Sequence, residues 1–234
     1  MGIAERKQRE KEQRRQHILQ VAETIFLEKG INSSTMDEIA AVCELSKGTL
    51  YLYFKSKEEL FLQIMVSIMT DFVNLIEDNL KRCRSLEERI NCLGESYLEF
   101  YRKYPNKFYI MNCHEDHPED SNHFRSSEND TFQGLDRIWQ VVESVLQEGI
   151  DAGIFNKECK PFEIGVMIWA SSNGMIRLMD HIKRSHSCSN QVNNKCENPR
   201  FCSLTETDYE SMLRRLWVSI IDSIRIKDIK QEKR

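Results

Sequence analysis

The chain has 234 residues and a formal net charge of −4, with 40% hydrophobic and 30% charged residues. This length suits one large domain or two unequal ones, and the apolar content is enough to bury a core, which argues against disorder throughout. Only 9 glycines and 4 prolines are present. Because a β-sandwich or β-barrel needs turn residues at short intervals, the composition argues against both folds.

Charge is distributed unevenly along the chain. Residues 1–57 carry 10 basic and 8 acidic side chains, whereas residues 58–234 carry 23 basic and 29 acidic ones. A negative total can therefore hide a local basic surface of the kind that contacts phosphates. The acidity of the whole chain does not exclude nucleic acid as a partner.

The N-terminal segment MGIAERKQREKEQRRQ contains no apolar stretch of the kind found in a secretory signal. Further along, no apolar run is long enough to span a membrane. We therefore expect a soluble, cytoplasmic protein with no membrane partner. In that compartment, the eight cysteines are expected to be reduced thiols or metal ligands rather than a disulfide framework.

Apolar residues recur at helical spacing along most of the chain. After a charged run over residues 5–15, a first apolar stripe predicts a helix that ends near Gly30. Further helices are expected over residues 35–42, 47–54, 56–82, 85–104, 105–114, 127–153, 161–183 and 206–228. The pattern therefore predicts an all-α protein of about nine helices without a strand, with loops at residues 115–126 and 185–204.

Several helix starts carry a capping signal. A capping box pairs a Ser or Thr with a Glu three residues later, so that each side chain bonds the other's backbone N–H. The expected boxes are Thr35 with Glu38, Ser56 with Glu59, Ser85 with Glu88, and Thr207 with Glu210.

Residues 35–57, TMDEIAAVCELSKGTLYLYFKSK, form the most informative segment. Two short helices joined by a tight turn, after a longer helix, are typical of a helix-turn-helix. The second of them starts with Ser46, Lys47, Gly48 and Thr49, and this turn suits close approach to DNA. Hydroxyls can donate to phosphates, a lysine can reach a base acceptor, and a glycine lets the backbone come near.

Three further residues in this segment suit contact with the DNA backbone. Tyr51 and Tyr53 each have an apolar body and a phenol that can reach a phosphate. Lys57 lies at the start of the next helix, where its ammonium and the exposed amides both favour phosphate. A packed helical hairpin, the alternative reading of the segment, would not require these polar residues.

On these residues the chain resembles the TetR family of bacterial transcriptional regulators. The matching pattern is Thr, Ile-Ala, a turn, Ser-x-Gly-Thr-Leu-Tyr-x-Tyr-Phe and Lys-x-Lys-Glu-x-Leu. The resemblance implies an N-terminal three-helix DNA-binding domain, residues 1–60, and a helical effector-binding and dimerisation domain, residues 61–234. It also implies that Thr35 contacts a phosphate, that Lys47, Gly48 and Thr49 face the major groove, and that Tyr51, Tyr53 and Lys57 hold the DNA backbone.

One position departs from the family pattern. Glu44 occupies the turn in which the family usually has glycine. A side chain with positive φ there is strained by ~1 kcal/mol, and a carboxylate is unfavourable near phosphate. The conformation of this turn is therefore open at the level of sequence.

Other residues are candidates for binding an effector. Aromatic side chains in the helices after residue 85 would either line an apolar pocket or pack in the core. Asn173 and Arg177, four residues apart on a mostly apolar helix, stand out because a buried arginine needs a partner such as a ligand carboxylate or Asp180. The effector-binding candidates are Tyr97, Tyr101, Phe108, Trp139, Asn173 and Arg177.

Two features allow alternative interpretations. The basic residues between Arg6 and Arg15 either form a solvated helix face or add phosphate contacts. Cys188, Cys196 and Cys202, near His181 and His186, could hold zinc, but their spacing lacks the close cysteine pair of most structural sites. A metal- or redox-sensing regulator is therefore the alternative function, and a second weak Cys/His cluster lies at residues 113–123.

The sequence thus predicts a DNA-binding transcriptional regulator, expected to act as a repressor that a small-molecule effector releases from operator DNA. No catalytic Ser/His/Asp order, phosphate loop or zinc-protease motif is present, so an enzyme is not expected, and no cofactor is expected. The partners are double-stranded operator DNA, an effector, and a second copy of the chain. The dimer is expected to form through the last two long helices, 161–183 and 206–228, whose apolar content exceeds what one buried face needs.

Overall fold

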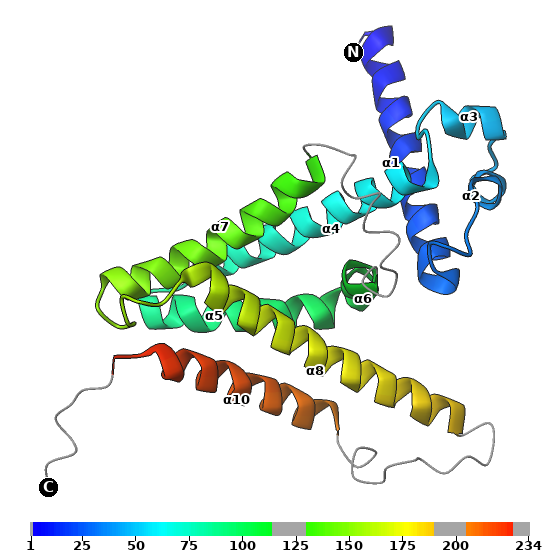
Figure 1. The fold of residues 1–234 in the computed structure, drawn as a ribbon. Helices are drawn as coiled ribbons and strands as arrows, with labels where there is room; N and C mark the ends of the chain where they lie inside the picture. The colour runs from blue at the N-terminus through cyan, green and yellow to red at the C-terminus, as the bar shows by residue number, and fades with distance from the viewer. Residues whose placement is uncertain (1, 114–129, 190–204, 227–234) are drawn as a thin grey trace, which may run out of the picture. The chain divides into compact units, whose positions relative to one another are not determined.

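The computed structural model describes residues 2–113, 130–189 and 205–226 (Figure 1). Over these ranges the chain forms nine helices, and the all-α prediction is confirmed. The chain divides into two compact units, one of Met1–Leu75 with Phe100–Ile138 and one of Ile76–Glu99 with Trp139–Arg234. The predicted helix-turn-helix lies within the first unit.

The first unit begins with α1 (Ile3–Lys29), α2 (Met36–Val42), α3 (Lys47–Tyr51) and most of α4 (Lys57–Leu80). One apolar residue from each of the first three, Ile18, Ile39 and Leu50, is completely buried in their shared core. By length and composition alone α4 could span a membrane, with a mean hydropathy of 1.5, but half of that stretch is buried within the fold. This burial is the property of a core helix.

Side chains cap the two short helices of the motif. The Thr35 hydroxyl accepts a hydrogen bond from the backbone N–H of Glu38, as expected. The reciprocal half of the predicted capping box does not form, because the Glu38 carboxylate instead binds the ammonium of Lys29. Helix α3 starts at the expected residue, with Ser46 as its cap, but ends three residues earlier than the sequence predicts.

The turn between α2 and α3 takes the strained conformation that the sequence left open. Glu44 has a φ of 56°, in the left-handed region. The backbone N–H of Glu44 donates to Ala41 and that of Leu45 to Ala40, which together form a Schellman motif. The same pair of bonds ends α7, where Gly153 occupies the equivalent position with a φ of 70°. Glu44 thus stands in a position that suits glycine.

Helix α6 (Pro105–Cys113) packs against α1 in the first unit. Its Lys107 forms an ion pair of 2.5 Å with Asp71 of α4. Glu23 of α1 faces the same pair, and its partial burial raises the pKa of its carboxyl, although Lys107 opposes the shift. A small charged group therefore connects these three helices.

The second unit contains most of α5 (Leu86–Lys103) and α7 (Asp130–Asp151), together with α8 (Pro161–Ser189) and α10 (Glu206–Ile224). Its apolar core includes Leu146 and Phe155, both completely buried. An isolated antiparallel bridge joins Phe155 to Arg225, just beyond α10. A Cβ on Gly149 would lie 2.4 Å from the Phe155 ring, so only glycine fits there.

Helix α10 is joined to its neighbours by specific contacts. The ring of Trp217 fills the space beside Gly94 of α5, and its indole N–H donates to the Ser172 hydroxyl of α8 at 2.7 Å. On the surface, Arg214 forms a two-pronged ion pair with Glu95 at 2.5 and 2.9 Å. Helices α8 and α10 run alongside each other (Figure 1).

Some predicted boundaries were wrong. Helix α10 begins with a capping box between Thr205 and Asp208, two residues before the predicted pair of Thr207 and Glu210. Both pairs have the correct spacing in sequence, and the earlier hydroxyl is the one that forms the cap. Helix α8 also runs to Ser189 rather than ending near residue 183. The loop expected at residues 115–126 lies outside the described residues.

Candidate nucleic-acid interface

The first turn of α3 is held in place by its own hydroxyl groups. The Ser46 hydroxyl accepts from the backbone N–H of Thr49 at 3.1 Å and lies 2.8 Å from the Thr49 hydroxyl. Leu50 anchors the buried side of this short helix, while Ser46, Lys47 and Gly48 are exposed. A rigid core therefore presents a polar helix start to solvent.

Lys47 forms an ion pair between two helices. Its ammonium lies 2.7 Å from the Asp37 carboxylate of α2, and both side chains are exposed. This hydrogen bond to the Asp37 carboxylate raises the pKa of Lys47. Sequence reasoning missed Asp37, because only tertiary packing brings two side chains ten residues apart together. An exposed pair of this kind contributes little to stability, so the lysine can exchange Asp37 for another acceptor.

Gly48 is a glycine that folding does not require. Its φ is not in the left-handed region, and a Cβ built on it would meet only the Ser46 hydroxyl, at 4.0 Å. The surrounding side chains therefore leave room for a methyl group. The fold thus gives no steric reason for glycine at this exposed position, whereas the close approach of a ligand would give one.

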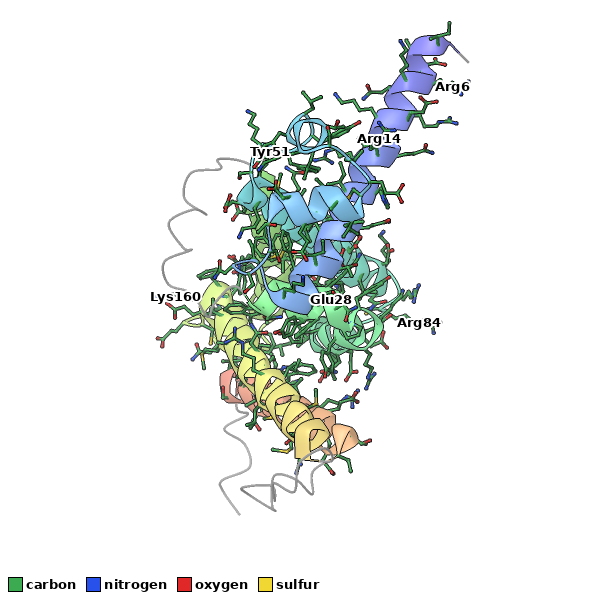
Figure 2. All side chains as sticks on the ribbon, turned by 90° about the vertical axis from the view of Figure 1, so that its right-hand side faces the viewer. Arg6, Arg14, Glu28, Tyr51, Arg84 and Lys160 are labelled. Carbon is green, nitrogen blue, oxygen red and sulfur yellow. The ribbon has the colours of Figure 1, made fainter. Side chains whose placement is uncertain are left out.

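The two tyrosines and Lys57 lie beyond this turn. Tyr51, on the outer surface of the unit (Figure 2), is 42% exposed, and Tyr53 is partly buried. The ammonium of Lys57 donates to the backbone carbonyl of Ser34 at 3.1 Å and lies 3.4 Å from that of Asn32. Lys57 thus ties the loop before α2 to the start of α4.

All eight predicted DNA-contacting residues belong to the first unit, and none of them is buried. The structure brings four of them together in the first turn of α3. The hydroxyls of Thr35 and Ser46 and the ammonium of Lys57 also make internal bonds that shape the motif. The residues concerned are Thr35, Ser46, Lys47, Gly48, Thr49, Tyr51, Tyr53 and Lys57.

The effector-binding candidates fall into separate groups. Tyr97 and Asn173, both buried in the second unit, meet through a hydrogen bond from the phenol to the amide oxygen. The Nδ2 atom of Asn173 is buried and has no hydrogen-bond partner in the described part of the chain. An amide donor left in this state lowers stability by about 1–3 kcal/mol, so it needs an explanation.

The other candidates have different neighbours. Tyr101 packs edge-to-face on Phe108 in the first unit, with ring centroids 5.2 Å apart. Trp139 packs in the second unit against Phe162 and Trp169 of α8. Arg177, expected to be buried, is only partly buried. Tyr97 and Asn173 are therefore the candidates that the structure joins by a polar contact.

The alternative of metal sensing depends on side chains outside the described residues, namely those of Cys188, Cys196, Cys202, His181 and His186. Among the side chains that are described, no group of three His, Cys, Asp or Glu residues could hold a metal ion. Cys43 is buried, and burial raises the pKa of its thiol, as it does for Cys92. These two thiols have the properties of packing residues rather than of reactive nucleophiles.

Comparison with known proteins gives a family match that lies within the first unit. Residues 18–64, which cover the end of α1 through the start of α4, match the model of a family described as bacterial regulatory proteins, tetR family. The match contains every predicted DNA-contacting residue.

Two relatives show how far the similarity extends. An HTH-type transcriptional regulator of Bacillus subtilis, YhgD, is 26% identical over 63% of this chain and 74% of its own length. The HTH-type transcriptional regulator QacR of Staphylococcus aureus is 34% identical, over 38% of this chain and 47% of its own length. The chain thus spans less than half of QacR.

Solved structures share the fold over more of the chain. The transcriptional regulator FadR of Bacillus subtilis, in complex with stearoyl-CoA, has a TM-score of 0.58 at 17% identity. It covers 89% of this chain and 98% of the FadR chain. The similarity of fold therefore continues well beyond the helix-turn-helix.

Proposed function

Because the chain belongs to the TetR family of bacterial regulatory proteins, we propose that it represses transcription by binding operator DNA, from which a small-molecule effector releases it. The observation that carries this proposal is the start of α3. It presents a charged lysine, two hydroxyls and a glycine that folding does not require. A surface built for packing alone would have no use for this combination.

In the proposed complex, α3 enters the major groove through its N-terminal turn. Lys47 leaves Asp37 and donates to a base acceptor, while Gly48 allows the backbone to approach the DNA. Tyr51 and Tyr53 donate to phosphates on either side. Lys57 retains its bonds to the loop carbonyls and offers its remaining N–H to the DNA backbone.

The test selects duplexes from a random-sequence pool with the wild-type protein and then measures the affinity of variants for the selected duplex. Lys47→Ala is expected to weaken binding by about 5- to 150-fold per half-site, the effect of losing one base contact. Lys81→Ala is the matched control, because Lys81 is also exposed and also forms a 2.7 Å pair, with Asp78. Failure to enrich any sequence, or equal affinity of both variants, would refute the proposal.

We further propose that the regulator acts as a homodimer through α8 and α10. Soluble proteins rarely leave large apolar side chains clustered on a surface without a partner. Both helices leave large apolar side chains partly exposed, by between 38% and 57%: Phe162, Met167, Trp169, Leu178 and Val218. Two of them, Phe162 and Trp169, also contact Trp139. Two-fold symmetry would then place two copies of α3 on the half-sites of a palindrome.

A charge placed on this surface tests the dimer. Val218→Glu puts a carboxylate on α10 at a position that is 54% exposed. Ile226→Glu, at a position 53% exposed just beyond the helix, is the control. Sedimentation is expected to show that only Val218→Glu shifts the protein towards monomer, with a parallel loss of operator affinity. A dimer that tolerates Val218→Glu would place the interface elsewhere.

For the effector, we propose a mainly apolar molecule whose polar end accepts a hydrogen bond from Asn173. The unpartnered Nδ2 atom of this buried amide supports the idea, because an acceptor on the ligand would satisfy it. Stearoyl-CoA is the first probe to use, since a protein of the same fold binds it. By linkage, such an effector must weaken operator binding by the factor by which the operator weakens effector binding.

Asn173→Asp tests the proposed contact. The substitution keeps the oxygen that accepts from Tyr97 and replaces the free donor by an acceptor. Stearoyl-CoA is expected to dissociate the wild-type operator complex but to act on the variant only at concentrations at least about tenfold higher, the effect of one lost hydrogen bond. Thermal unfolding of the ligand-free variant checks that the fold remains. An intact wild-type complex in saturating stearoyl-CoA would reject this class of effector.

The proposed action takes place in the cytoplasm and consists of binding equilibria, with no catalytic residue or cofactor. The proposal does not depend on the Cys/His segment around residues 181–202.

A further inference from the structure

Helix α1 extends far beyond the core of the first unit. Its first deeply buried residue is Ile18, and every residue from Gly2 to Arg14 is exposed. Residues 3–17, which we call the N-terminal arm, form about 22 Å of helix at 1.5 Å per residue. Figure 2 shows Arg6 and Arg14 on the part of α1 that projects from the unit. The arm therefore gains little stability from packing against the core.

Three of the six cations of the arm share one side of the helix. With 100° between successive residues, Lys7, Lys11 and Arg14 fall within an arc of about 60°. They are spaced as i, i+4 and i+7, so their side chains lie above one another along the helix. We call these three residues the basic stripe.

Each carboxylate of the arm has a bonding partner outside the basic stripe, although Glu10 borders the stripe on the helix surface. Glu5 accepts from the backbone N–H of Gly2 at 2.9 Å, Glu10 pairs with Arg6 at 2.8 Å, and Glu12 accepts from Gln16 at 2.8 Å. No hydrogen bond or ion pair to the basic stripe occurs within residues 2–113, 130–189 or 205–226. Three cations on one face are thus available to an external anion.

Contacts at the base of the arm set the direction of this face. The guanidinium of Arg15 donates to Gln63 of α4 at 2.8 Å and lies over the buried Phe54 ring, 5.3 Å from its centroid. Lys11, one turn before Arg15, therefore lies above the side of α1 that faces the junction between α3 and α4. In both views the arm projects past the end of the unit at which α3 lies (Figures 1 and 2).

We propose that the basic stripe binds the phosphate backbone of duplex DNA next to the half-site read by α3. This inference rests on the proposed function and adds a second, sequence-independent contact to it. Duplex DNA carries one negative charge per about 1.7 Å of its axis, so a cationic helix face beside the recognition helix meets phosphates over its length. The stripe strengthens binding to every sequence and does not choose between bases.

Salt dependence is the measurement that isolates such contacts. Each phosphate neutralised by a cation releases counterions and makes the slope of log K against log salt steeper by about 0.9. Lys7→Gln with Lys11→Gln removes two cations per subunit and four per dimer. We expect the slope to become shallower by about 2 to 4, and the affinity at low salt to fall by one to two orders of magnitude.

A second variant separates the position of the cations from their number. Adding Gln13→Lys and Gln16→Lys to the double variant restores the net charge but moves both cations off the stripe, to positions about 130° and 170° from its centre. Glutamine and lysine have similar helix propensities, so the arm should remain helical, and circular dichroism checks this. The moved charges are expected to leave the slope and the affinity as low as in the double variant.

The outcomes are distinguishable. A double variant with the wild-type slope overturns the inference, and so does recovery of the wild-type slope when the cations are moved, because net charge alone would then account for the effect. The duplex is the one selected by the wild-type protein. If selection yields no duplex, the proposed function fails before the arm is tested, whereas a selected duplex with an unaffected slope rejects the basic stripe alone.

Discussion

Replacing Gly48 by alanine separates the demands of folding from those of DNA binding. The residue lies in the first turn of α3, has no left-handed φ, and leaves room for a Cβ, whose nearest neighbour would be the Ser46 hydroxyl at 4.0 Å. If the glycine serves only the approach of DNA, alanine should stabilise the folded chain and weaken the complex. Opposite signs in the two measurements are the prediction.

The magnitudes follow from this environment. Glycine within a helix is less stable than alanine by about 0.5–1 kcal/mol, which corresponds to a rise in Tm of about 1–4 °C for a domain of this size. A methyl group that displaces one contact at the DNA is expected to lower affinity by about 1–3 kcal/mol for each half-site, or about 5- to 150-fold. Both half-sites of a dimer carry the change.

Differential scanning calorimetry gives the change in Tm, and fluorescence anisotropy with a selected duplex gives the affinity. The difference in Tm between Gly48→Ala and wild type, measured without DNA, isolates the contribution of the substitution to stability. Unchanged operator affinity in Gly48→Ala would refute the assignment of α3 to the groove, and a fall in Tm would refute the account of its environment.

Three further predictions concern single positions. Glu44→Gly is expected to stabilise the chain by about 0.5–1 kcal/mol, seen as a higher urea midpoint, because it relieves the left-handed strain; a lower midpoint would contradict this. Gly149→Ala is expected to lower stability by about 1–3 kcal/mol in the same assay, since its methyl would overlap the buried Phe155 ring; an unchanged midpoint would show that the ring can move. Burial raises the pKa of the Glu23 carboxyl in the folded chain. As pH rises from about 4, the unfolded chain therefore releases this proton at a lower pH than the folded chain, and the free energy of unfolding decreases between about pH 4 and pH 7. The Tm of Glu23→Gln relative to wild type should therefore increase from pH 4 to pH 7, and a constant difference would show that Glu23 is not buried in solution.

The helices could be predicted because their signals are local. Apolar spacing identified all nine, and the first residues of α3 and α6 were correct, since Ser46 caps one and Pro105 starts the other. The first residue of α10 was also correct, but its capping pair was wrong because Thr205 and Thr207 each have an acidic residue three positions later. Local spacing could not choose between two equivalent caps.

The candidate site could be predicted in outline for a similar reason. The start of α3 was identified by its polar residues, because a segment used only for packing would not require them. The pair between Lys47 and Asp37 and the bonds of Lys57 to the loop before α2 were not predictable, because these partners meet only after the helices pack. The eight predicted DNA contacts stay predictions until DNA binding is measured.

The sequence by itself determined the helical class, the helix-turn-helix and the resemblance to the TetR family, because periodicity, caps and a dense local motif depend on residues close together in the chain. It also showed an acidic chain whose first quarter is slightly basic. Only the tertiary structure decided that Glu44 takes a left-handed turn and that Gly48 has free space while Gly149 has none. It also showed that the basic stripe extends beyond the core and has no partner among the residues that the structure describes. Each of these depends on which side chains lie nearby in space, and that is set by the packing of distant segments.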